Sequence, residues 1–82
     1  MIEAPTFEIG DHAVIVDHST TFRPYGSREF VFRVTTKGTT TVYRIDVPLL
    51  DVADKSPAEV ARYLLAEVPR ATPLFSFSAQ GS

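Results

Sequence analysis

The fold is decided by the segment REFVFRVTTKGTTTVYRIDV, residues 28–47, in which apolar and polar side chains alternate on both sides of Lys37-Gly38. An apolar residue at every second position is typical of a strand with one buried face. The apolar positions are Phe30, Phe32, Val34, Tyr43, Ile45 and Val47. A glycine beside a polar residue suits a two-residue turn with positive φ. The segment therefore predicts a β-hairpin in which Phe32 lies opposite Tyr43.

A second hairpin is predicted in the segment 6–18. Apolar residues alternate before Gly10-Asp11, and a β-branched run follows it. A two-residue type II′ turn at this pair sets Phe7 opposite Val14. The pair equally suits a bulge within one longer strand. Both alternatives place the segment in a sheet.

The connection between these hairpins, residues 19–27, is polar and contains a proline and a glycine, so we expect neither regular strand nor helix. It concentrates Phe22, Arg23 and Tyr25, and aromatic and arginine side chains are enriched at interaction hot spots. These three residues are therefore candidate protein-binding residues. The alternative is that the two rings tuck under the edge of the sheet.

One helix is clearly indicated after the second hairpin. Ser56 is a suitable N-cap, Pro57 suits the first helical position, and Glu59 completes a capping box. Apolar residues then recur at helical spacing, and Pro69 ends the pattern. They are Val60, Ala61, Leu64, Leu65 and Val68. We expect this face to lie across the apolar face of the sheet.

The segment Leu74–Ser78 alternates weakly, which favours a short last strand. Otherwise it is an exposed apolar strip for a second subunit or another protein to cover. Phe75 and Phe77 are therefore the second set of candidate protein-binding residues. Residues 79–82 are expected to form a disordered tail.

These elements predict an α+β fold, in which two hairpins form an antiparallel sheet of about four strands with one α-helix on one face. The short C-terminal strand is an optional addition. The 82 residues form a single domain, since the chain is too short for a second core. With 44% hydrophobic and 22% charged residues, the composition argues against intrinsic disorder.

The sequence excludes several kinds of chemistry. It contains no cysteine, which rules out disulfides, thiolate zinc sites and cysteine nucleophiles. His12 and His18 lie six residues apart on a predicted strand, roughly 20 Å, which is too far to share one ion. Asp17-His18-Ser19 has the residue types of a hydrolase triad, but neighbouring strand residues point to opposite faces. We therefore expect no catalytic site, metal or cofactor.

Arg33, Lys37 and Arg44 are the candidates for an alternative nucleic-acid site on the polar face of the hairpin. Glu29 and Asp46 share that face, so its charge is mixed. The formal net charge of the whole chain is −2, which also argues against general nucleic-acid binding. A nucleic-acid module would be recognised by an affinity that falls steeply with added salt.

The leading hypothesis is a small non-catalytic binding or regulatory domain that acts through protein–protein contact. Adaptors, inhibitors and phage-encoded modulators are the analogous classes. Its partner would be another protein, a second copy of the chain, or both. The sequence shows no signal peptide and no membrane-spanning stretch, so we expect a cytoplasmic protein without membrane contact.

Overall fold

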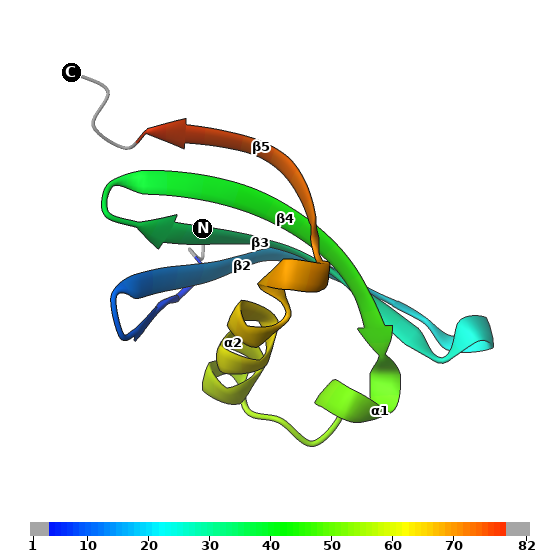
Figure 1. Cartoon of the computed structure of the whole chain (residues 1–82). Helices are drawn as coiled ribbons and strands as arrows, with labels where there is room; N and C mark the ends of the chain where they lie inside the picture. The colour runs from blue at the N-terminus through cyan, green and yellow to red at the C-terminus, as the bar shows by residue number, and fades with distance from the viewer. Residues whose placement is uncertain (1–3, 79–82) are drawn as a thin grey trace.

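The computed structural model describes residues 4–78, which form one antiparallel sheet with helices on one side (Figure 1). The sheet has five strands, whose order in space follows the chain. They are β1 (Thr6–Ile9), β2 (His12–Phe22), β3 (Ser27–Thr36), β4 (Thr39–Pro48) and β5 (Thr72–Ser78). The predicted α+β class is confirmed, and the weak C-terminal pattern is a fifth strand. The predicted tail, residues 79–82, lies outside the described residues.

In the described part of the chain, two helices and two short 3₁₀ turns connect the strands. The turn η1 (Arg23–Tyr25) joins β2 to β3. Between β4 and β5 the chain forms α1 (Leu49–Val52), α2 (Pro57–Ala66) and η2 (Val68–Arg70). The sequence predicted α2, whereas the helical turn at residues 49–52 was not predicted. No helix within residues 4–78 is long and apolar enough to cross a membrane.

The β3–β4 hairpin has the predicted register, with Phe32 opposite Tyr43. The two rings stack with their centroids 5.5 Å apart. Lys37 and Gly38 have φ of 53° and 82°, and two positive values in succession are the pattern of a type I′ turn. A turn of this type follows the twist of the strands, and it keeps Phe32 and its apolar neighbours on one face.

The β1–β2 hairpin resolves the alternative left open by the sequence. Phe7 lies opposite Val14, and Gly10 at the turn has a φ of 60°. The chain therefore reverses here, and the bulge interpretation is wrong for Gly10. A bulge does occur later in β2, where the register with β3 shifts between Val16 and His18.

The bulge at Asp17 changes which side chains of β2 face the helices. Val16 lies opposite Phe32 and Ser19 lies opposite Phe30, so both are on the side of the core. His18 lies on the other side of the sheet. Without the extra residue, strict alternation after Val16 would place His18 on the side of the core and Ser19 on the other side.

The connection at residues 19–27 is much shorter than the sequence predicted. Thr20 and Thr21 continue the ladder between β2 and β3, which closes where Phe22 lies opposite Ser27. The proline falls within η1, where its fixed φ is acceptable, and Gly26 takes a left-handed φ of 61°. Pro24 and Gly26, which were expected to interrupt regular structure, are therefore confined to the turn.

The core lies between the sheet and α2. Buried residues from both hairpins and the helices form one cluster: Val14, Phe30, Phe32, Val34, Ile45, Val47, Val52, Ala61, Leu64 and Ala71. The capping box of α2 is present, with Ser56 Oγ accepting from Glu59 N at 3.3 Å and Glu59 Oε1 accepting from Ser56 N at 2.8 Å. Hydrogen bonding from Ser56, mainly from its backbone N–H, holds the pKa of the Glu59 carboxyl below its usual value. The predicted packing of the helix is confirmed.

Candidate protein-interaction surface

The side of the sheet opposite α2, here called the open face, has no helix over it among the described residues (Figure 1). The strand registers assign to it the residues that lie opposite one another across β2, β3, β4 and β5. They include Ile15, Val31, Arg33, Thr40, Val42, Arg44, Phe75 and Phe77. The open face therefore mixes ionic and apolar side chains, with the aromatic ones on β5.

Two residues of the open face are buried although no helix within residues 4–78 covers them. Thr40 and Val42 are each only 5% exposed. Their cross-strand neighbours on β5 are Phe77 and Phe75, whose rings stack at 6.1 Å. Directly opposite residues are close enough for side chains to cover one another. We infer that the aromatic pair of β5 shields this part of the open face.

The β5 edge, defined as residues 72–78, is the outermost strand on its side of the sheet. All seven of its residues are exposed, and none is charged. Phe75 and Phe77 remain 58% and 45% exposed, and Leu74 is 47% exposed. Natural edge strands are usually protected by charge, proline, short length or a covering loop. This edge has Pro73 at its second position and no charged residue.

The hairpin tip, defined as residues 22–26, is the other predicted contact region. It projects from the end of the β2–β3 hairpin (Figure 1). Tyr25 is 83% exposed and Phe22 41%, so the alternative in which both rings tuck under the sheet is wrong. A hydrogen bond from Leu49 N to Gly26 O (2.8 Å) ties the tip to α1, where Leu50 is 88% exposed.

The two predicted contact regions do not form one site. Beside the hairpin tip, Ser27 lies opposite Pro48, whereas Phe77 lies opposite Thr40. Pro48 lies eight positions after Thr40 along β4, which is roughly 26 Å of extended chain. The tip and the far end of β5 therefore lie at opposite ends of the molecule (Figure 1).

The arginines of the proposed nucleic-acid site share the open face, as predicted, but carboxylates already neutralise them. Arg33 donates through Nε and Nη2 to the two oxygens of Asp17, at 2.8 and 2.7 Å. Arg44 donates through Nε to Glu29 and lies 3.6 Å from Asp46. The third candidate, Lys37, is exposed at the hairpin turn. The surface is thus electrically balanced.

The structure also separates the residues considered for catalysis and metal binding. Asp17 is engaged by Arg33, His18 Nε2 lies 2.8 Å from Thr20 Oγ1, and Ser19 points to the helix side. These contacts contain no relay from a carboxylate through a base to a nucleophile. His12 Nδ1 bonds Thr36 Oγ1 at 2.6 Å instead. Within residues 4–78 no three His, Cys, Asp or Glu side chains gather in a metal-holding group.

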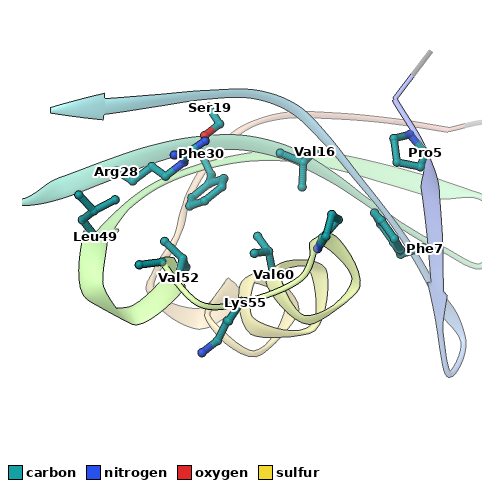
Figure 2. A pocket seen from close by; sticks show the side chains of 12 residues that line it. Pro5, Phe7, Val16, Ser19, Arg28, Phe30, Leu49, Val52, Lys55 and Val60 are labelled. Atoms are coloured by element: carbon teal, nitrogen blue, oxygen red, sulfur yellow. The ribbon is translucent and has the colours of Figure 1, made fainter. Parts of the chain in front are cut away.

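Sequence reasoning missed one polar residue on the helix side. Arg28 donates through Nε to Ser19 Oγ at 2.5 Å and through Nη1 to Thr21 Oγ1 at 2.9 Å. It borders a pocket of about 500 Å³ between the sheet and the α1–α2 segment (Figure 2). A signal for it existed, because Arg28 has the same strand parity as Phe30 and Phe32. An arginine among core positions indicates a polar group at the core boundary.

Comparison of the chain with protein-family models, with curated proteins and with solved structures finds no match. The fold itself defines the class as a five-stranded antiparallel sheet with helices on one face.

Proposed function

We propose that this chain is a small non-catalytic binding domain that acts through protein–protein contact, with the β5 edge as its contact surface. The observation that carries the proposal is the exposure of all seven residues of a neutral edge strand, with Phe75 and Phe77 on its open face. An edge strand binds another strand through its main chain, and the projecting side chains provide specificity.

The partner that fits this strand best is a second copy of the chain. Two identical strands can pair antiparallel about a twofold axis, which makes the contact the same on both subunits. With the axis at Ser76, Phe75 of each chain lies opposite Phe77 of the other, and the four rings form one aromatic patch. The absence of charged residues in β5 means that the pairing brings no like charges together.

The nucleic-acid alternative has weaker support. Arg33 and Arg44 already contact carboxylates, so a phosphate backbone would have to displace those partners. The hairpin tip, with Phe22, Arg23 and Tyr25, is the second candidate for protein contact. Its exposed rings favour it, but it offers a partner no free strand edge.

The experiment is analytical ultracentrifugation of the full chain, from low to several hundred micromolar, for the wild type, Phe77→Lys and Tyr25→Lys. We expect a concentration-dependent dimer that Phe77→Lys abolishes, because it places each lysine opposite Phe75 of the second copy and diagonally across from the other lysine. Tyr25→Lys is the matched control, since it changes an exposed aromatic residue in the same way at the other end of the molecule.

A wild-type chain that stays monomeric throughout this range would exclude the second copy as partner. Tagged protein would then be used to retain partners from a cell lysate, with and without nuclease. If a partner protein is retained by the wild type and by Tyr25→Lys but not by Phe77→Lys, the contact surface is still β5. The reverse pattern would assign binding to the hairpin tip, and retained nucleic acid would favour the Arg33–Arg44 face.

A further inference from the structure

The pocket beside Arg28 is open at one side and mostly apolar. Figure 2 shows Val16 and Phe30 on the sheet side, Val52 and Val60 opposite them, and Phe7 of β1 at one end. At the other end the pocket is bordered by Leu49 and by two polar residues, Arg28 and Ser19. Its volume of about 500 Å³ lies within the range of small-molecule sites.

Arg28 differs from the arginines of the open face in its partners. Arg33 and Arg44 contact carboxylates, whereas the contacts of Arg28 are the hydroxyls of Ser19 and Thr21 and the ring of Phe30. The guanidinium carbon lies 5.5 Å from the centroid of that ring. Within residues 4–78 no acidic side chain forms an ion pair with Arg28. Among the described residues, therefore, no carboxylate neutralises its positive charge.

The two hydroxyls hold the guanidinium in position and leave donors for another group. A guanidinium has five N–H donors, and the hydroxyls of Ser19 and Thr21 take two of them. A carboxylate matches the planar arrangement of the remaining N–H donors and forms short, charge-assisted hydrogen bonds with them. Lys55 also borders the pocket, but its ammonium points away from the cavity (Figure 2) and lies 5.4 Å from the ring centroid of Tyr63.

We propose that this pocket binds a small amphiphilic carboxylate, meaning a medium-length apolar chain that ends in one carboxylate group. Arg28 takes the carboxylate, and the apolar chain lies between Phe30 and the side chains of Val52 and Val60. The N-terminus of α2 borders the same pocket, but the capping box of Ser56 and Glu59 already occupies it. Arg28 is therefore the group that receives the anion.

This site is separate from the surface proposed for protein contact. The pocket lies on the helix side of the sheet, whereas Phe75 and Phe77 lie on the open face. If the chain does not bind the ligand, the proposal for β5 still stands. If the chain is monomeric, the proposal for the ligand still stands.

The test compares octanoate with octanol, which share an alkyl chain but differ in the charged group. Both are titrated into the isotopically labelled full chain, and amide chemical shifts report the site and the dissociation constant. We expect octanoate to shift the amides around Arg28, Val52 and Val60 and to bind at least about tenfold more tightly than octanol. Because this comparison uses the wild-type chain, it does not depend on how a variant folds.

Three variants locate the interaction. Arg28→Gln should lower the affinity for octanoate to that for octanol. Arg33→Gln is the matched control, because it removes an arginine from the same strand on the opposite face, and it should leave octanoate binding unchanged. Ala53→Phe fills the pocket from an exposed position and should weaken both ligands.

Equal affinity of the wild type for the two ligands would overturn the proposal, as would shifts centred away from the pocket or no binding of octanoate. It would also be overturned if Arg28→Gln, with an unchanged amide spectrum in the absence of ligand, bound octanoate as the wild type does.

Discussion

The two faces of the sheet reach burial in different ways. On the helix side, side chains from alternate strand positions meet the apolar face of α2, and Phe32 and Leu64 are completely buried. On the open face, Val42 is nearly as buried without any helix, beside the exposed ring of Phe75 on the neighbouring strand. Burial on the helix side depends on two packed layers, the sheet and α2. Burial on the open face depends on β5, the single strand added at the edge. The second should therefore stabilise the fold less.

Leu64→Ala should produce the largest loss of stability, because it opens a cavity where the helix meets the sheet. We expect the free energy of unfolding to fall by about 3 kcal/mol, as measured by urea denaturation. Leu50→Ala is the matched control, since Leu50 is 88% exposed, and its effect should stay within about 0.5 kcal/mol. Equal losses from the two variants would contradict the two-layer description.

Phe75→Ala tests the open face directly. The ring is 58% exposed, so its removal exposes part of Val42 and sacrifices only partial burial. We expect a loss of about 1 kcal/mol in the free energy of unfolding, measured at a protein concentration too low for association. A loss as large as that of Leu64→Ala would mean that β5 contributes to the fold as much as the helical layer does.

The ion pair between Asp17 and Arg33 should contribute the least. Its side chains are 33% and 38% exposed, and solvent screens pairs of this kind. A double-mutant cycle with Asp17→Ala and Arg33→Ala should give a coupling energy of about 0.5 kcal/mol, which decreases in high salt. The absence of any coupling at low salt would mean that this contact does not stabilise the fold.

Local patterns predicted the parts of the fold that local forces determine. The Lys37-Gly38 and Gly10-Asp11 turns and the capping box at Ser56 each depend on residues close together in sequence. Strand alternation then specified the register around Phe32, because a slip by one residue would expose the whole apolar set. The candidate contact residues of the hairpin tip and of β5 were also chosen from the sequence, by residue type. The sequence did not predict how exposed they are or how far apart the two groups lie.

The sequence by itself therefore determined the β3–β4 hairpin, the start and buried face of α2, and the absence of cysteine chemistry. Only the tertiary structure decided which long-range neighbours each side chain has. It placed β5 beside β4, inserted the bulge at Asp17 that turns Ser19 toward the helix side, and gave Arg28 hydroxyl partners beside an apolar pocket. These features join segments far apart in the chain, and a periodic pattern specifies the face of a side chain but not its neighbour across the fold.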